Sequence, residues 1–160
     1  MGYDYKEAMK LENQICFPLY AAARNIVNRY AQFLKPLGLT YTQYIVFLVL
    51  WEQDEITVGE ICSRLMLDNG TISPLLKKMQ QAGYIEKKRS REDDRVVVIA
   101  LTQEGRQLQR KAKDIPLKMM GCVSLPEEKG RELYALLHEL IDRNQCAVKK
   151  EKENRNENSL

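Results

Sequence analysis

TVGEICSRLMLDNGTISPLLKKMQQAGYIEKKRSREDDRVVVIAL, residues 57–101, is the stretch that decides the fold of this chain. It opens with Thr57 and Glu60, which have the spacing of a capping box. In such a box the Thr hydroxyl accepts from the backbone three residues on, and the Glu side chain reaches back to the Thr amide. We therefore expect a helix to begin at Val58. Apolar residues then recur at the spacing of one buried helical face, namely Val58, Ile61, Cys62 and Leu65.

A second helix is expected from Asn69-Gly70 toward Gly83, after a break too short for more than a turn. Its inward residues are Ile72, Leu75, Leu76 and Met79, and its outward residues are Thr71, Ser73, Lys77, Lys78 and Gln81. Proline is tolerated in a first turn, where its missing N–H has no helical partner in any case. We therefore place Pro74 in or near the first turn, and expect the helix to start later or looser than its apolar pattern indicates.

The outer face of this second helix is small, polar and basic, which suits the major groove of DNA. Short side chains near the N-terminus reach base edges there, while lysines neutralise phosphates. The candidate DNA-binding residues on this helix are Asn69, Thr71, Ser73, Pro74, Lys77 and Lys78. On the two helices alone, a helix-turn-helix and an ordinary pair of packed helices are equally good interpretations.

The strand-like runs that follow favour the DNA-binding interpretation. Residues 84–101 hold two β-prone runs around a polar tip at 90–95, as in a β-hairpin. Arg91 and Arg95 lie at or near this tip, where an arginine can enter the negative potential of a narrow minor groove. Asp94 is expected to orient the Arg95 guanidinium by a charge-assisted hydrogen bond.

These residues resemble a known family. The runs Leu67–Met79, Asp93–Val96 and Ile99–Gly105 are similar, in order and spacing, to the winged helix of MarR-type transcriptional regulators. The resemblance implies a mainly α fold with a small β-wing, in which a winged helix-turn-helix at about residues 40–102 is embedded in a helical homodimer. It also implies double-stranded DNA as the partner, bound at a palindromic operator.

The composition sets bounds on function without assigning one. The chain has 160 residues and a formal net charge of only +3, so a nucleic-acid role has to rest on where the basic residues are placed. Its four cysteines include no CxxC pair and it has one histidine, which disfavours a zinc site or a disulfide-knit fold. We expect no metal and no cofactor. No run has the length of a membrane span and no signal peptide is evident, so we expect a cytoplasmic protein without a membrane partner.

Long helices on either side of the winged helix are expected to form a dimer core. The first occupies about residues 8–36, with Pro18 in its first turn and Cys16 at or just before its N-terminus. The last occupies about residues 124–148 and starts at a capping box of Ser124 and Glu127. Its apolar stripe consists of Leu133, Leu136, Leu137, Leu140 and Ile141. A twofold dimer explains these faces most simply, because most soluble oligomers are symmetric.

Residues 1–148 are therefore predicted to form a single domain. Residues 149–160 are charged, Asn-rich and nearly free of apolar side chains, which predicts a disordered tail. Before the last helix, a polar helix capped by Thr102 is expected to reach about Ile115-Pro116. A Met-rich connector at 117–123, without strong helix signals, should follow it.

Within the MarR type, the chain resembles the OhrR-type organic-hydroperoxide sensors. The segments that carry this likeness are Leu11–Phe17, Leu39–Tyr44 and Leu48–Glu52. The resemblance implies that Cys16 is the peroxide-reactive thiol and that Tyr30 and Tyr41 bond it across the dimer. Its position agrees, because a helix N-terminus lowers the pKa of a thiol and oxidation starts from the thiolate. From position alone, a packed core cysteine with two packed tyrosines is the alternative.

The other cysteines are less clearly assigned. Some members of that family carry a resolving cysteine of the other subunit near the position of the connector at 117–123. The resemblance therefore makes Cys122 a possible resolving residue. The alternative is that Cys122 is an unreactive residue of the connector. Cys62 is expected to be structural and Cys146 incidental. Pro18 stands where the family carries a non-proline residue, which affects the flexibility or solvent access expected around Cys16.

The leading hypothesis is a homodimeric repressor that senses organic hydroperoxides by oxidation of Cys16 and then releases its operator. The alternative is a MarR-type repressor gated by a small aromatic acid in the cleft between dimer core and winged helix, with Cys16 passive. An enzyme, such as a thiol peroxidase turning over at Cys16, is disfavoured because a winged helix has no use in it.

Overall fold

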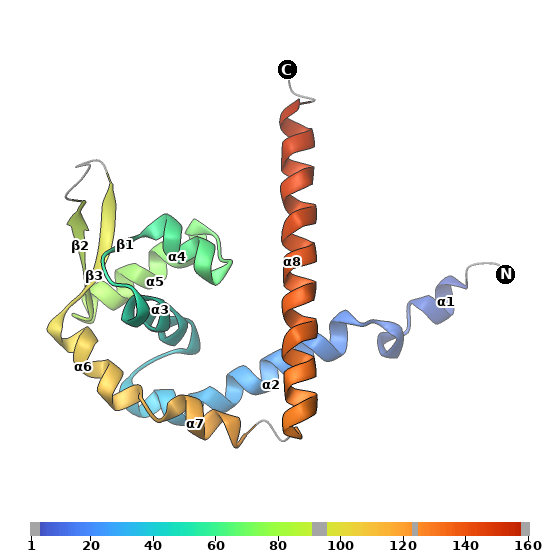
Figure 1. Cartoon of the computed structure of the whole chain (residues 1–160), viewed down its shortest axis with the longest axis horizontal. Helices are drawn as coiled ribbons and strands as arrows, with labels where there is room; N and C mark the ends of the chain where they lie inside the picture. The colour runs from blue at the N-terminus through green and yellow to red at the C-terminus, as the bar shows by residue number, and fades with distance from the viewer. Residues whose placement is uncertain (1–3, 91–95, 123–124, 158–160) are drawn as a thin grey trace. The chain divides into compact units, whose positions relative to one another are not determined.

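The computed structural model describes residues 4–90, 96–122 and 125–157, with side chains described as far as Asn144. The chain divides into two compact units, residues 1–122 and residues 123–160, and each is described by itself. Unit 1 holds the predicted helix pair and hairpin, and unit 2 holds one long helix (Figure 1). The single domain expected over residues 1–148 therefore stays a prediction.

Unit 1 consists of helices around a small sheet, close to the predicted order. Its elements are α1 (Tyr5–Ala8), the 3-10 turn η1 (Leu11–Asn13), α2 (Cys16–Leu34), the 3-10 turn η2 (Lys35–Leu37), α3 (Tyr41–Glu52), β1 (Ile56–Thr57), α4 (Val58–Leu65), α5 (Asn69–Gln81), β2 (Ile85–Arg89), β3 (Val97–Leu101), α6 (Gln103–Ala112) and α7 (Ile115–Met120). This is the mainly α fold with a β-wing that the sequence predicted.

Unit 1 contains two capping boxes, one of them the predicted box at Thr57. The Glu60 amide donates to Thr57 Oγ1 at 3.1 Å and the Thr57 amide donates to Glu60 Oε2 at 2.7 Å, so α4 begins at Val58 as expected. At the start of α3, the Gln43 amide donates to Thr40 Oγ1 at 3.3 Å and the Thr40 amide to Gln43 Oε1 at 2.9 Å. Each box satisfies donors that a helix N-terminus otherwise leaves unpaired.

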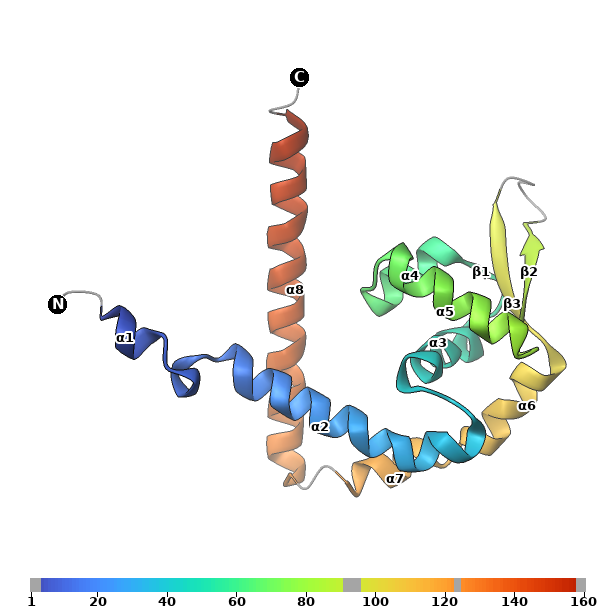
Figure 2. The same ribbon diagram turned by 180° about the vertical axis from the view of Figure 1, so that it is seen from behind.

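The core of unit 1 forms around α3. The buried residues of α3 are Tyr44, Val46, Phe47, Val49 and Leu50. Ile61 of α4 and the inward residues of α5 pack into the same cluster, together with Ile85, Ile99 and Leu101 of the hairpin. Burying one such side chain contributes about 1.5–3 kcal/mol. Helices α4 and α5 and the hairpin are thus fixed to a common core. In both ribbon views α5 lies beside the sheet (Figure 2).

The sheet contains one strand that the sequence pattern did not reveal. Its order is β1-β3-β2, all antiparallel, with Ile85 opposite Leu101 and Arg89 opposite Val97 in the predicted hairpin. The extra strand, β1, has two residues and pairs Ile56 with Ile99. A two-residue strand has no alternation to detect, so only the pairing with β3 makes it visible.

Pro74 lies deeper in its helix than predicted. The helix α5 begins at Asn69 and places Pro74 in its second turn, so the expectation of a later or looser start was wrong. Proline there removes the donor that the Gly70 carbonyl would use. The start is fixed upstream by Asp68, whose side chain caps the helix by accepting from the Thr71 amide at 2.8 Å. This cap, worth about 1 kcal/mol, offsets part of the cost of the proline, about 3 kcal/mol.

The predicted connector is a short helix in the structure. The helix α6 ends at Ala112 rather than near Ile115-Pro116, and α7 then runs from Ile115 to Met120. Pro116 sits in the first turn of α7, where its missing N–H costs nothing. Ile115 and Met119 are both buried, one helical turn apart, so tertiary packing supplies what the sequence signals lacked.

Unit 2 is the helix α8, Glu127–Glu157. It carries the predicted apolar stripe, of which Leu133, Leu136 and Leu140 are exposed within this chain. Residues 149–157 are helical, where a disordered tail was predicted. Ser124, the expected capping residue, lies outside the described residues.

Within the described residues, no single helix is long and apolar enough to cross a membrane. Taken together, the bent pair Cys16–Leu37 and Tyr41–Glu52 is long and apolar enough for a span, by length and composition alone. The second helix of this pair is the core helix α3, whose apolar residues are largely buried in unit 1.

Candidate DNA interface and candidate redox site

The N-terminus of α5 presents a set of short polar side chains that bond one another. Thr71 Oγ1 donates to Asp68 Oδ2 at 2.8 Å, and Ser73 Oγ donates to Asn69 Oδ1 at 2.7 Å. The bonds from Thr71 hold the pKa of the Asp68 carboxyl below its usual value. Because both hydroxyl protons are engaged within the helix, the face is organised before any partner binds.

All six candidate DNA-binding residues of α5 are exposed, on one helix whose opposite side is buried. They are Asn69, Thr71, Ser73, Pro74, Lys77 and Lys78. The inward residues Ile72, Leu76 and Met79 are fully buried, as predicted. Short polar groups thus stand at the N-terminal end of the exposed face and two ammonium groups one turn later, which is the arrangement a major groove accepts.

The described part of the wing adds exposed cations. Lys87, Lys88 and Arg89 lie on β2, and Lys88 pairs with Glu86 at 2.9 Å and with Glu55 at 3.5 Å. Its hydrogen bond to Glu86 raises the pKa of the Lys88 ammonium. Arg91, Asp94 and Arg95, the residues predicted at the wing tip, lie outside the described residues.

The base of the wing is tied to α3 and α6 by contacts that no local pattern predicts. Asp54, just after α3, accepts from the Leu101 amide at 2.9 Å and pairs with Arg106 of α6 at 2.6 Å. Thr102 Oγ1 donates to the Gly83 carbonyl at 2.7 Å, at the entrance to β2. These bonds set the direction of the hairpin relative to α5.

Cys16 is the first residue of α2, as predicted from Pro18. Its thiol is free and exposed, and the N-cap position, Ile15, supplies no side-chain hydrogen bond. In this first turn the Phe17 amide donates to the Gln14 carbonyl at 3.2 Å and Pro18 has no N–H, so the positive end of the helix dipole is the main feature that favours an anion here. The chain therefore presents an accessible thiol at the N-terminus of a helix.

Three tyrosines cluster between α2 and α3. The ring centroid of Tyr30 lies 4.9 Å from that of Tyr41 and 5.7 Å from that of Tyr44. Burial raises the pKa of all three phenols, and the neighbouring phenol adds to the rise at Tyr30 and Tyr44. Tyr30 and Tyr41 were predicted, from the family resemblance, to belong to the redox site. Tyr44, 2% exposed, was not, although it follows Tyr41 at helical spacing.

Cys16 and Tyr30 of one chain cannot meet. Both lie on α2, and their separation of 14 positions corresponds to about 21 Å along the axis at 1.5 Å per residue. The structure therefore brings together the tyrosines but not the cysteine with them. Any bond between the Cys16 thiol and the Tyr30 hydroxyl requires a second copy of the chain.

Two other cysteines of unit 1 are half-buried against its core. Cys62 packs there from α4, which agrees with a structural role. Cys122 follows α7, where its amide donates to the Met119 carbonyl at 2.9 Å. The side chain of Cys146 lies outside the described residues.

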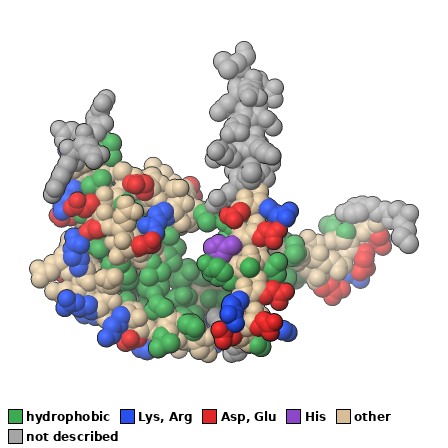
Figure 3. Space-filling view, viewed as in Figure 1, with side chains coloured by type: hydrophobic (Ala, Val, Ile, Leu, Met, Phe, Trp, Pro, Cys, Tyr) green, Lys and Arg blue, Asp and Glu red, His purple; other side chains and the backbone are tan. Residues whose placement is uncertain are grey.

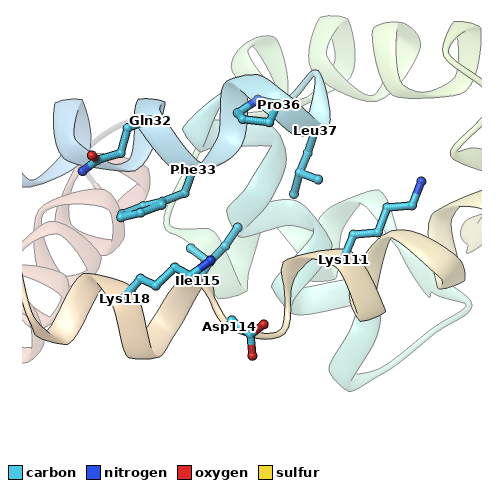
Figure 4. A pocket seen from close by; sticks show the side chains of 8 residues that line it. All are labelled: Gln32, Phe33, Pro36, Leu37, Lys111, Asp114, Ile115 and Lys118. Carbon is cyan, nitrogen blue, oxygen red and sulfur yellow. The ribbon is translucent and has the colours of Figure 1, made fainter.

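A shallow pocket of about 250 Å³ lies between the end of α2 with η2 and the α6–α7 corner (Figure 4). Its apolar lining comes from Phe33, Pro36, Leu37 and Ile115, and its polar lining from Gln32, Lys111, Asp114 and Lys118. Lys118 Nζ lies 6.0 Å from the centroid of the Phe33 ring. Such a lining can hold a small apolar group with an anionic end.

Comparison with known proteins identifies the family. Residues 29–112, more than half of the chain, match the family described as transcriptional regulator SarA/Rot. The chain belongs to this family of MarR-like winged-helix regulators. The predicted fold and the predicted role in transcription are thereby confirmed.

Among the proteins similar to this chain is a regulator named for hydroperoxide resistance. That relative, the organic hydroperoxide resistance transcriptional regulator of Bacillus subtilis (strain 168), is 44% identical over 134 residues, covering 84% of this chain and 91% of the relative. Reduced AbfR bound to DNA, a Staphylococcus epidermidis protein, is 31% identical with a TM-score of 0.69, over 88% of this chain and 98% of that one. Disulfide-formed AbfR is 34% identical with a TM-score of 0.58, over 86% and 96%.

Proposed function

We propose that this regulator is a homodimeric repressor that binds a palindromic operator while Cys16 is reduced and releases it when an organic hydroperoxide oxidises Cys16. One observation carries the proposal: an exposed thiol stands at a helix N-terminus, and Tyr30, one of the two tyrosines that the resemblance pairs with it, is about 21 Å away along the same helix. A second copy supplies what one chain lacks. The relative named for hydroperoxide resistance supports the choice of oxidant.

Exposed apolar faces on both units support dimerisation. In unit 1 they include Ile15, Phe17, Leu19, Tyr20, Ile26, Leu117 and Met120, and in unit 2 Leu125, Leu133, Tyr134, Leu136 and Leu140. The space-filling view also shows hydrophobic side chains gathered over α3 and the adjoining part of α2 in unit 1 (Figure 3). Large contiguous apolar patches mark interaction sites, and a twofold axis satisfies each patch with its own copy.

The chemistry at Cys16 is a two-electron oxidation. The thiolate attacks the terminal oxygen of the hydroperoxide, an S–O bond forms, the O–O bond breaks, and the departing alkoxide takes up a proton to become an alcohol. Sulfur ends as a sulfenic acid and the peroxide is reduced. Because burial raises the pKa of Tyr30 and Tyr41, their phenols stay protonated near neutral pH and donate to the thiolate.

Release of DNA requires that oxidation move the recognition helices. In a twofold dimer the two α5 helices read the two half-sites, so the affinity depends on their spacing. A change of packing where Cys16 meets the partner's tyrosine cluster alters α2 and α3, on which the winged helix is built. Small shifts at an interface convert into discrete rearrangements because close-packed cores are bistable.

The decisive experiment measures operator affinity before and after one equivalent of an organic hydroperoxide, with intact mass spectrometry on the same sample. We expect the affinity to fall in step with addition of oxygen or a thiol to Cys16. Cys16→Ser should keep its operator after treatment, and Cys62→Ala, which removes another free cysteine of unit 1, should respond like the wild type. Operator release by Cys16→Ser at the wild-type peroxide dose would remove Cys16 as sensor.

The pocket beside Phe33 favours a second candidate, a repressor gated by a small aromatic acid. Phe33, Leu37 and Ile115 offer apolar contacts to an aromatic ring. Lys111 and Lys118 offer cations for a carboxylate, with Asp114 as an opposing charge. This function needs no oxidation, so Cys16→Ser would respond to the ligand as the wild type does. Salicylate or benzoate titrated against the operator complex without peroxide distinguishes the two candidates.

A further inference from the structure

A series of aromatic contacts runs from the tyrosine cluster to the base of the wing. Tyr44, which lies 5.7 Å from Tyr30, has its ring centroid 6.3 Å from that of Trp51 in an edge-on arrangement. Trp51 stacks on Phe47 at 5.2 Å, and Phe47 meets Tyr84 edge-on at 5.7 Å. All these separations fall in the range in which aromatic rings attract one another. Tyr84 is the residue immediately before β2.

Trp51 also holds a hydrogen bond that leaves the aromatic series. Its Nε1 donates to the Gly105 carbonyl at 3.0 Å, although the two residues are 54 positions apart. Gly105 lies in the first turn of α6, directly after the wing. Trp51 therefore contacts the start of the hairpin through Phe47 and Tyr84, and the end of the hairpin through Gly105.

The two ends of the hairpin are locked together at this place. The Thr102 amide donates to the Tyr84 carbonyl at 3.1 Å. A Cβ added to Gly105 would lie 2.2 Å from that same carbonyl oxygen, so backbone meets backbone with no space between. A junction packed this closely passes on a displacement instead of absorbing it, because interiors have crystal-like density and low compressibility.

We propose that Trp51 is the positioning residue that couples the tyrosine cluster at the redox site to the base of the DNA-binding wing. The inference rests on the proposed function, because it supposes that oxidation of Cys16 disturbs the cluster. A shift of Tyr44 is then carried by Trp51 to Gly105 and, through Phe47, to Tyr84, so that the wing turns as one body with its two strands. Tyr44 acts in this series as the link between the phenols and Trp51.

Tryptophan fluorescence can follow this coupling without an added label, because Trp51 is the single tryptophan of the chain. In full-length wild-type protein, complete oxidation of Cys16 by cumene hydroperoxide should change the emission of Trp51, and dithiothreitol should reverse the change. Cys16→Ser should show no change at the same dose. Unchanged emission in wild type whose Cys16 is oxidised and whose operator is released overturns the coupling, whatever any variant does.

Variants at Trp51 separate transmission from stability. Trp51→Phe keeps a ring against Phe47 and Tyr44 but loses the donor to Gly105. It should bind the operator in the reduced state with about the wild-type affinity, while the ratio of oxidised to reduced dissociation constants falls by roughly 2- to 30-fold, the range typical of residues that carry coupling between sites. Trp51→Leu, which loses both ring and donor, should bring that ratio still closer to one.

A matched control guards against general loosening of the core. Leu108→Val shortens a buried side chain of α6, the helix that holds Gly105, and Leu108 is not part of the aromatic series. This variant should keep the wild-type ratio of oxidised to reduced dissociation constants. If Trp51→Phe also keeps the wild-type ratio, or if Leu108→Val lowers it as much, the role of Trp51 is wrong while the sensor stands. If wild-type protein keeps its operator after Cys16 is oxidised, the proposed function fails, and the coupling fails with it.

Discussion

The Asp68 carboxylate accepts two hydrogen bonds from Thr71, one from its backbone amide to Oδ1 and one from its hydroxyl to Oδ2, each at 2.8 Å. The carboxylate thus caps the recognition helix and at the same time orients a residue of its DNA-binding face. The helix start and the chemistry of that face therefore depend on one group.

The first prediction follows from the charge of Asp68. Its pKa is lowered in the folded protein, so its stabilising contribution is present above the unfolded value, near 3.8, and is lost as the pH falls through the lower folded value. Asp68→Asn should still cap the helix, because Asn and Asp are equally good N-caps, but its melting temperature should depend less on pH below that value. Melting curves of both proteins across the acid range measure this. Parallel pH profiles would mean that Asp68 is not ionised in this cap.

The second prediction concerns Gly105. A methyl group there would meet the Tyr84 carbonyl at 2.2 Å, and overpacking of this kind costs about 1–3 kcal/mol of unfolding free energy. Gly59→Ala is the matched control, since its added Cβ meets only Thr57 Oγ1, at an ordinary 3.8 Å. Chemical denaturation should show Gly105→Ala destabilised and Gly59→Ala unchanged or stabilised. Equal stability of the two variants would contradict the close approach of α6 to the wing.

The capping boxes at Thr40 and Thr57 show what the sequence could predict: each depends on residues three positions apart, so spacing alone places the helix start. The same holds for the hairpin strands and for Cys16 at the start of α2. The contacts of Asp54 with Leu101 and of Trp51 with Gly105 join residues 47 and 54 positions apart. No local pattern encodes such contacts. Tyr44 was missed for a related reason, since a tyrosine on a core helix looks like packing until its neighbours are known.

The third prediction concerns the exposed lysines of α5. Lys77 and Lys78 face outward, and a lysine that meets only phosphate weakens binding to all sequences alike when it is removed. Each replacement by Ala should make the slope of log affinity against log salt shallower by about one unit. Titrations of operator and scrambled duplex over a range of salt measure both effects. A change in base preference would instead assign that lysine to a base edge.

The fourth prediction concerns the wing tip. Arg95 was predicted from the sequence to enter the minor groove, and Arg95→Ala should weaken operator binding by about 1–3 kcal/mol. Lys87→Ala, on the described part of β2, is the comparison for a general loss of positive charge. Both variants are measured at the same salt concentration. If Arg95→Ala binds as tightly as wild type, the wing tip does not contact the operator.

The last prediction concerns the fate of oxidised Cys16. A sulfenic acid condenses with any thiol that reaches it, forming a disulfide and releasing water, and otherwise proceeds to irreversible acids as oxidant accumulates. If Cys122 of the partner subunit is the resolving thiol, mild peroxide should give a covalent dimer on non-reducing gels, which dithiothreitol should reverse with recovery of operator binding.

Geometry limits this two-cysteine route, because a disulfide requires Cα atoms within about 7 Å of each other. Cys122 is half-buried behind α7, a helix of six residues, so α7 has to shift or unwind if the reduced dimer holds the two thiols farther apart. A helix of only six residues opens more readily than a long one. Cys122→Ser separates the routes: with Cys122 as resolving thiol, this variant should form no covalent dimer and should lose reversibility as peroxide rises. If Cys122→Ser still releases DNA reversibly and wild type forms no crosslinked dimer, Cys122 is a bystander and an external thiol completes the cycle.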